Sequence, residues 1–444
     1  MKFALPKGQS SLKELKDILT QNRRSGSGAV YSVCSAHPWV LEAAIQQATK
    51  DNTILLVEST SSQVNQEGGY TGQTPLEFAQ SIASAAKRAG LAEGRVLLGG
   101  DHLGPFPWRN QISSIALEKA CELVRACVLA GYQKIHLDSS MPCADDPKNP
   151  LDAQVVAQRA AVLAGAAEGA FAELPSGSNP PVYVIGTEVP APGGETAAGE
   201  PPVVTTHDHV QYTLETFRSA FSKRKLLDAW ERVVASVVQP GVEFGDDVVF
   251  LYDREKARML SSALPKDSPI VYEAHSTDYQ SVRALCEMVE DHFAILKVGP
   301  WLTFAFREAI FALSAIEREL LGGNKSTQLS EVRQTLENAM LRNPSHWRSY
   351  YHGDEAQQRF ARAYSYSDRC RYYWHESEVQ EEVKRLLSNL ESQSLPPTLI
   401  SQFLPLEYDA GRVGSRSAGP RELVRSHIQA IVRRYAKACE FSVI

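Results

Sequence analysis

Short apolar runs recur along the first 300 residues, and segments with helical spacing separate them. The runs are four to seven residues long and rich in Val and Ile, which is typical of strands buried on both faces. Eight strands are expected at 29–33, 54–58, 96–100, 134–138, 182–186, 233–239, 270–273 and 294–298. Between them, segments such as 40–49 and 76–86 favour helices. This alternation predicts right-handed βαβ units and a parallel sheet.

The expected fold class is α/β, with the eight strands closed into a TIM (β/α)8 barrel. An open, doubly wound sheet is the alternative, and it would gather polar residues at one switch point. Here nearly every run ends in polar residues instead: Ser32, Glu58, Asp101 and His102, Asp138, Glu188, Gln239, Glu273 and His275, and Lys297. That distribution favours the closed barrel, whose active sites lie at the carboxyl ends of the strands.

No strand is expected after about residue 315. Segments 329–341, 378–387 and 420–432 have the spacing of amphipathic helices. We therefore expect a barrel in residues 1–315 and a helical extension packed on it in residues 316–444. Segments 165–181 and 191–203, rich in Ala, Gly and Pro, are expected to be loops.

Composition narrows the class of protein. The net charge is −6 over 444 residues and Lys and Arg are dispersed along the chain, so no basic patch suggests binding of nucleic acid. Seven Cys without a Cys-x-x-Cys pair argue against a disulfide framework and for a reducing compartment. The first residues reach a Pro and charges too early for a signal peptide, and no apolar run approaches the roughly 18–20 residues of a membrane span. A cytoplasmic protein that contacts no membrane is expected.

Three residues on different strand ends could hold a metal ion. His102, Glu188 and His275 should converge at the mouth of a barrel, and two imidazoles with a carboxylate suit a divalent Lewis acid. Zn, Mn, Co, Ni and Mg all remain open. Lys297 keeps a Schiff-base alternative open. The simpler alternative is that these side chains only shape the pocket.

Asp101 is expected to act as a general acid or base, unless it caps a helix or orients a ligand imidazole. A second carboxylate would then be needed, and Glu243 or Glu58 is expected to supply it. The expected substrate-binding residues are Gln63, Asp138, Glu273, Lys297, Gly299 and Arg307.

A phosphate is expected on the Gly299-Pro300 loop, where barrels commonly hold one, with Lys297 or Arg307 assisting. The Arg- and Tyr-rich segment 363–374 is expected to be a packing seam, or else a lid that contributes Arg369 or Arg371. No nucleotide-binding fingerprint is present.

Several longer phrases together resemble one family. They include Gln66-Glu-Gly-Gly-Tyr-Thr-Gly, Gly99-Gly-Asp-His-Leu-Gly-Pro, Lys134-Ile-His-Leu-Asp, Ile185-Gly-Thr-Glu-Val-Pro, Glu273-Ala-His-Ser-Thr-Asp-Tyr and Tyr364-Ser-Tyr-Ser-Asp-Arg. The chain is similar, nearly end to end, to the Z subunits of D-tagatose-1,6-bisphosphate aldolase. Members of that family are described as non-catalytic aldolase subunits, as tagatose-6-phosphate kinases or as metal-dependent epimerases.

The resemblance implies a metal-dependent 4-epimerase that interconverts D-tagatose 6-phosphate and D-fructose 6-phosphate. The C4 hydrogen of such a ketose is not acidic, because C4 is beta to the ketone, so inversion requires retro-aldol cleavage of C3–C4 and re-addition of the turned aldehyde. The alternative implied is a non-catalytic subunit that stabilises a class II aldolase. An aldolase catalytic subunit and a second copy of the chain are the partners left open.

Overall fold

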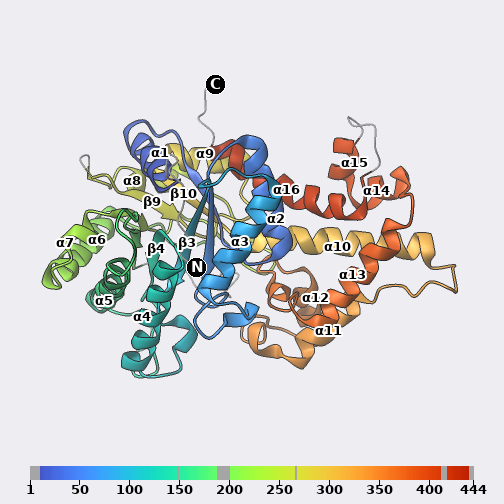
Figure 1. Ribbon diagram of the computed structural model, residues 1–444, viewed down its shortest axis with the longest axis horizontal. Coiled ribbons are helices and arrows are strands. Elements are labelled where there is room, and N and C mark those ends of the chain that lie inside the picture. The colour runs from blue at the N-terminus through green and yellow to red at the C-terminus, as the bar shows by residue number, and fades with distance from the viewer. Residues whose placement is uncertain (1–10, 148–149, 188–200, 266–267, 412–417, 440–444) are drawn as a thin grey trace.

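A computed structural model describes residues 11–147, 150–187, 201–265, 268–411 and 418–439. Eight parallel strands close into a barrel, in the order β1-β10-β9-β6-β5-β4-β3-β2 (Figure 1). Their bounds are β1 Val30–Val33, β2 Leu55–Thr60, β3 Val96–Leu103, β4 Lys134–Leu137, β5 Val182–Ile185, β6 Val233–Val237, β9 Val271–Ala274 and β10 Phe293–Val298. Each predicted run overlaps one of these strands, and the predicted TIM barrel is confirmed.

Helices cover the outside of the barrel because each buries an apolar face against the strands. They are α2 Pro38–Asp51, α3 Pro75–Ala89, α4 Ser113–Leu129, α5 Ala153–Phe171, α6 His207–Lys223, α7 Leu227–Trp230, α8 Arg254–Ser261 and α9 Val282–Glu290. Helix α1, Ser11–Ser25, contacts β3 and β9 from outside the sheet. Ser11 donates to the main-chain oxygen of Val96, the first residue of β3, so α1 lies at the amino ends of the strands and leaves the carboxyl ends open.

Helix α5 corrects one expectation. The predicted loop 165–181 is helical as far as Phe171, and Gly165 and Gly169 lie inside the helix. A row of buried alanines, among them Ala160, Ala164 and Ala167, packs α5 against α4 and α6. The small side chains that suggested a loop therefore serve close helix packing. The second predicted loop, 191–203, falls mostly outside the described residues.

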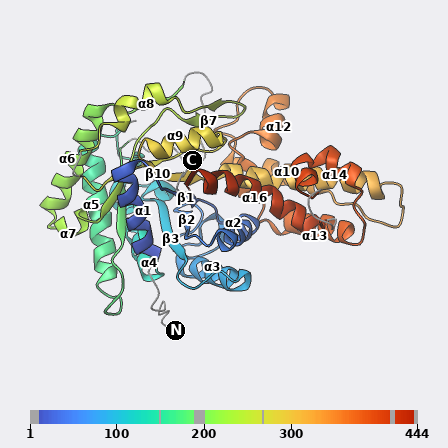
Figure 2. The same ribbon diagram turned by 90° about the horizontal axis from the view of Figure 1, so that it is seen from above.

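The extension is helical and projects to one side of the barrel (Figures 1 and 2). Its helices are α10 Pro300–Leu321, α11 Val332–Arg342, α12 Glu355–Tyr364, α13 Ser377–Glu391, α14 Pro397–Phe403, α15 Pro405–Gly411 and α16 Pro420–Cys439. Helix α10 starts directly after β10 and runs through the predicted boundary at 315 without a break. The division into two domains stays a prediction.

Helix α16 returns from the extension to the barrel, as Figure 2 shows. It packs against α2, α9 and β1, so it fills the place in the outer layer beside the first strand. Tyr435 on α16 donates to the main-chain oxygen of Thr277, 2.7 Å away, in the loop after β9. Among the helices described, none is both long and apolar enough to cross a membrane.

Candidate active site

Asp101 and His102 are adjacent in β3, yet both line one cavity at the carboxyl ends of the strands. The pairing of β3 with β4 shifts between Gly100 and Leu103, where β3 holds one residue more than β4. At this bulge His102 has a φ of 48°, in the left-handed region that few residues other than Gly adopt. Side chains of neighbouring residues in a regular strand point to opposite faces. The bulge brings both to the same side.

The close approach of β3 to β4 fixes the ring of His102. A Cβ atom on Gly104 would lie 1.6 Å from the main-chain oxygen of Asp138, so only glycine fits there. The Asp138 carboxylate thereby reaches the imidazole, and its Oδ2 accepts from Nδ1 of His102 at 2.8 Å. Asp138 does not line the cavity. Its position fits the orientation of an imidazole better than the predicted contact with substrate.

Three imidazole rings, those of His102, His136 and His275, form a triangle with centroids 4.9–5.2 Å apart. Glu273 Oε1 accepts from Nε2 of His275 at 3.0 Å. Nδ1 of His136 lies 3.1 Å from Asp101 Oδ1. The other nitrogen of His136, Nε2, is buried and has no hydrogen-bond partner in the described part of the chain. Buried polar atoms almost always have partners, so a ligand fits at this atom.

Donor atoms of Asp101, His136, Glu273 and His275 all lie within 4.8 Å of one another. The triangle of rings adds His102, whose Nε2 is 3.7 Å from Asp101 Oδ2. The two sets share His136 and His275, and their mixture of imidazole and carboxylate donors suits a divalent transition metal. His102 therefore lies directly beside these four residues.

Of the predicted metal ligands, His275 lies in this group of four, His102 lies beside it, and Glu188 lies outside the described residues. His136 was not predicted. A signal for it was present, because Lys134 and His136 alternate along β4 and Asp138 continues the alternation just past its end.

A buried layer of charge is centred on two lysines next to the cluster. Lys134 Nζ lies 2.8 Å from Glu58 Oε1 and 2.7 Å from Glu273 Oε2. Lys297 Nζ lies 3.0 Å from Glu58 Oε2 and 2.8 Å from Asp101 Oδ1. Two ammonium groups thus face three carboxylates, and the excess of negative charge favours a bound cation.

The ionisation of Lys297 disfavours the Schiff-base alternative. Burial by itself would lower the pKa of Lys297, but Asp101 and the other anions around it raise that pKa well above its usual value. A protonated amine is not a nucleophile. Lys297 therefore acts as a fixed positive charge beside Asp101.

Burial and the surrounding charges shift the pKa values of His275 and His102 in opposite directions. Burial lowers the pKa of His275 to about 3, which keeps the ring in the neutral form that binds metals. Burial opposes charge on His102 too, but the carboxylates of Asp101 and Asp138 raise its pKa. Burial likewise opposes ionisation of Asp101, yet His102 and Lys297 hold its pKa well below the usual range. Asp101 is thus an ionised carboxylate.

Glu58 does not fit the predicted role of acid or base. The expected end of its strand was residue 58, but β2 continues to Thr60, so Glu58 lies deeper in the barrel and is 0% exposed. Its carboxylate accepts from Ser32 Oγ at 2.6 Å as well as from Lys134. Glu273 is buried in the same way, against Lys134 and His275, and does not line the cavity.

Glu243 lies in a small hairpin after β6, formed by β7 Glu243–Phe244 and β8 Val249–Phe250. Its Oε1 accepts from the main-chain N–H of Phe244 at 2.9 Å. Phe244 lines the cavity and Glu243 does not. The role of Glu243 as a second acid or base stays a prediction.

The main-chain N–H groups of the predicted phosphate loop already bind the carboxylate of Asp278. Gly299 lines the cavity, but its N–H donates to Asp278 Oδ1 at 3.0 Å, and the N–H of Trp301 donates to the same atom at 2.8 Å. A phosphate there would meet this buried negative charge. Arg307 does not fit the predicted role either, because it lies further along α10 and its Nε donates to Asp368 Oδ1 at 3.0 Å, away from the cavity.

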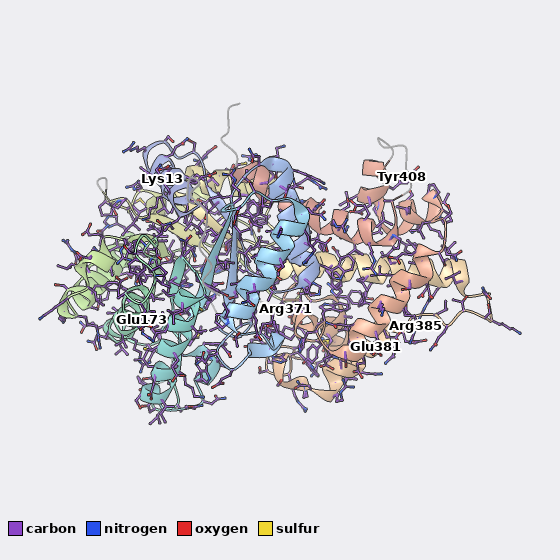
Figure 3. The ribbon with its side chains drawn as sticks, in the orientation of Figure 1. Lys13, Glu173, Arg371, Glu381, Arg385 and Tyr408 are labelled. Atoms are coloured by element: carbon purple, nitrogen blue, oxygen red, sulfur yellow. The ribbon has the colours of Figure 1, made fainter. Side chains whose placement is uncertain are left out.

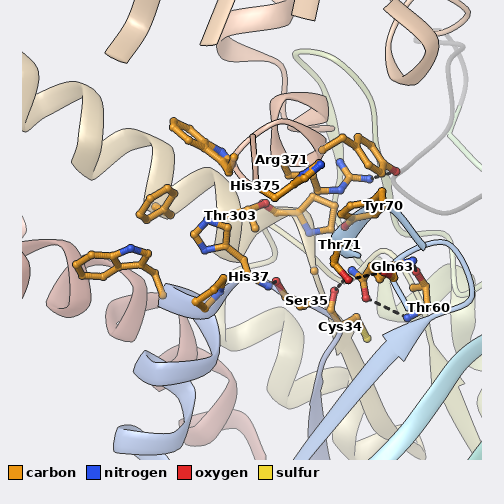
Figure 4. A pocket seen from close by; sticks show the side chains of 18 of the residues that line it. Cys34, Ser35, His37, Thr60, Gln63, Tyr70, Thr71, Thr303, Arg371 and His375 are labelled. Atoms are coloured by element: carbon orange, nitrogen blue, oxygen red, sulfur yellow. Dashed lines mark hydrogen bonds between the residues drawn. The ribbon is translucent and has the colours of Figure 1, made fainter. Parts of the chain in front are cut away.

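The cavity has a volume of about 590 Å³, within the usual range for small-molecule sites. The barrel supplies its floor, including Lys297 and His275, and the extension supplies part of its wall, including Arg371 and Trp374. The predicted substrate residue Gln63 lines it, donating to the main-chain oxygen of Cys34 at 3.3 Å and accepting from Thr60 N–H at 3.0 Å (Figure 4). The site is therefore shared between barrel and extension.

The chain is similar to known proteins in sequence and in fold. A family model described as D-tagatose-1,6-bisphosphate aldolase subunit GatZ/KbaZ-like matches residues 15–440. The crystal structure of a probable tagatose 6 phosphate kinase from Sinorhizobium meliloti 1021 is 41% identical, with a TM-score of 0.83, over 93% of this chain and 100% of that one.

More distant structures include two aldolases. The YdjI aldolase from Escherichia coli K12 is 10% identical with a TM-score of 0.40, over 86% of this chain and 99% of that one. A fructose-bisphosphate aldolase from Campylobacter jejuni is 13% identical with a TM-score of 0.43, over 85% and 93%. Similarity this low says nothing about the chemistry of the present site.

Proposed function

The chain belongs to the GatZ/KbaZ-like family of D-tagatose-1,6-bisphosphate aldolase subunits, and from this premise we propose that it is itself an enzyme. The proposed activity is a metal-dependent 4-epimerisation between D-tagatose 6-phosphate and D-fructose 6-phosphate. The observation that carries the proposal is the buried triangle of His102, His136 and His275, with a nitrogen of His136 that has no partner in the described chain. A subunit that only stabilised another protein would not need such a cluster beside a cavity.

The residues fit a divalent ion, which the imidazoles of His102, His136 and His275 would hold. Imidazole donors favour Zn, Co or Ni over Mg, which prefers oxygen ligands. When bound, the ion supplies Lewis-acid polarisation of the substrate carbonyl and stabilises negative charge. Asp138 and Glu273 would keep the rings of His102 and His275 in place, as carboxylates commonly do for metal-bound histidines.

The chain's own contribution to the chemistry is proton transfer at the C4 oxygen. Asp101, ionised beside Lys297, takes the proton from the C4 hydroxyl as the C3–C4 bond breaks and its electron pair stays on the ketone fragment. The aldehyde turns and C3 attacks its opposite face. The C4 oxygen then regains a proton, and Glu243 remains the carboxylate predicted to supply it.

The test is to incubate the purified chain alone with D-fructose 6-phosphate, with and without added divalent metal. We expect D-tagatose 6-phosphate to form, chelation to stop the reaction, and His136→Ala to lose both metal and turnover. His352→Ala is the matched control, because His352 is exposed in the extension and does not line the cavity. Metal-loaded protein that forms no tagatose 6-phosphate would contradict the proposal.

The family description names an aldolase subunit, and this favours one alternative, in which the chain is a non-catalytic subunit that stabilises a class II aldolase. In that case the chain alone would be inactive and would raise the melting temperature and specific activity of an aldolase catalytic subunit on mixing. His136→Ala, properly folded, would still stabilise that partner.

A further inference from the structure

Arg371 comes from the extension but lines the same cavity as Asp101 and His275. It lies on the short helical turn Arg369–Tyr372. Figure 3 places it where the barrel helices meet the extension, and Figure 4 shows it beside His375 and Tyr70 in the pocket. Arg371 thus belongs to the part of the cavity wall that the extension supplies.

The charge of Arg371 is not neutralised by an ion pair. Its Nη1 donates to the main-chain oxygens of Ser367 and of Asp368, the latter at 3.1 Å, and its Nη2 donates to the hydroxyl of Tyr372 at 2.9 Å. No carboxylate in the described ranges lies within 4.0 Å of it. The Nε–H and a second Nη2–H therefore have no acceptor there, and they are the adjacent donors that bind two oxygens of a phosphate.

Aromatic packing holds Arg371 in this orientation. The ring of Tyr372 stacks on His346, with centroids 4.5 Å apart and an interplanar angle of 11°. Tyr70, from the barrel loop after β2, packs edge-on against Tyr372 at 4.8 Å. Because these contacts join barrel and extension, the guanidinium is fixed before a ligand arrives, which lowers the entropic cost of binding.

The other cations suggested by the sequence are already engaged. Arg307 is paired with Asp368, and Lys297 is surrounded by carboxylates. Arg369, two residues before Arg371, donates to the main-chain oxygen of His346 and lies over the ring of Tyr350, and it does not line the cavity. The amides at the start of α10 are taken by Asp278.

We propose that Arg371 binds the phosphate group of the substrate through its Nε and Nη2 donors, so that the extension selects phosphorylated over free ketoses. This proposal rests on the proposed function only for the identity of the sugar. It moves the phosphate from the Gly299-Pro300 loop to the wall that the extension supplies, and it gives the extension a direct part in substrate recognition.

The test measures equilibrium binding of D-fructose 6-phosphate, D-fructose and inorganic phosphate to metal-loaded protein by calorimetry. We expect Arg371→Gln to weaken binding of fructose 6-phosphate roughly 10²-fold and to leave binding of fructose unchanged. Arg371→Lys, which keeps the charge but not the paired donors, should fall between. The matched control is Arg385→Gln, because Arg385 is paired with Glu382 on α13, further out on the extension (Figure 3).

An Arg371→Gln protein that keeps the wild-type preference for fructose 6-phosphate would overturn the proposal. The proposal would also be overturned if the wild-type protein bound fructose 6-phosphate no better than fructose. The same holds if inorganic phosphate did not compete with fructose 6-phosphate for binding. Binding does not require turnover, so the two proposals fail separately. An inactive protein with Arg371-dependent binding refutes the epimerase alone, and an active one with Arg371-independent binding refutes only the phosphate site. Melting temperatures of both variants show that they fold.

Discussion

Asp138 accepts a hydrogen bond of 2.8 Å from the imidazole of His102, across two neighbouring strands of the barrel. The contact exists because Gly104 lets β3 approach the main chain of Asp138. It determines which nitrogen of His102 is left for a metal ion, since Nδ1 is used by the carboxylate.

Asp138→Ala should therefore weaken metal binding by about 10–100-fold, the usual effect of removing the partner of a ligand histidine. Competition with a chelator of known affinity measures it. Asp208→Ala serves as the control, because the Asp208 side chain is fully exposed on α6. Equal metal affinity in wild type and Asp138→Ala would mean that His102 is not a ligand.

Asp101→Asn should lower turnover by about 10²–10⁴-fold while metal and substrate still bind, because the amide cannot take the proton from the C4 hydroxyl. Steady-state kinetics together with metal analysis checks this. Near-normal turnover would remove Asp101 from the acid–base role. Loss of the metal in the same protein would make it a ligand instead.

Gly104→Ala should destabilise the protein by about 2–4 kcal/mol, because the new Cβ would lie 1.6 Å from the main-chain oxygen of Asp138. Chemical denaturation gives the change in the free energy of unfolding. Gly323→Ala is the matched substitution, with no atom within 4 Å of its Cβ, and should be nearly neutral. Similar stabilities for the two variants would show that β3 and β4 can separate at this point.

Stability should also depend on pH through His427, which joins three helices. Its Nδ1 lies 3.0 Å from Glu407 on α15 and its Nε2 lies 3.1 Å from Glu308 on α10. Burial alone would lower the pKa of His427, but hydrogen bonds to these two carboxylates raise it from 6.5 to about 9. The folded protein therefore holds this proton more tightly than the unfolded chain does.

Because the folded pKa is the higher one, this contribution is complete below pH 6.5 and disappears as the pH rises through about 9. We expect about 2–3 kcal/mol, measured as the difference in free energy of unfolding between wild type and His427→Gln at pH 6 and pH 9.5. A difference that stays constant between the two pH values would contradict the expected linkage.

The strands of the barrel could be predicted because each is buried on both faces and flanked by helical spacing. The residues at which the strands end could be predicted less accurately. Strand β2 runs two residues beyond Glu58, and this placed Glu58 in the charged interior and not at the mouth. Hydrophobicity does not mark a strand end when the last residues alternate between core and cavity.

The candidate site was predicted in part. His102, His275, Asp101 and Lys297 meet as the convergence of strand ends implies. The bulge that turns His102 toward Asp101 depends on register with β4, which one strand's sequence does not encode. The place of Arg371 in the wall depends on how the extension folds back, a long-range contact that no local pattern contains.

The return of α16 to the barrel has a consequence for biosynthesis. Helix α16 covers β1, one of the earliest strands to leave the ribosome, yet it spans residues 420–439. Until that helix is translated, the apolar surface beside β1 lacks its cover. A nascent barrel therefore exposes this apolar surface to solvent. The last helix of the extension is thus needed to complete the apolar cover of the barrel, so folding of the barrel and folding of the extension are coupled.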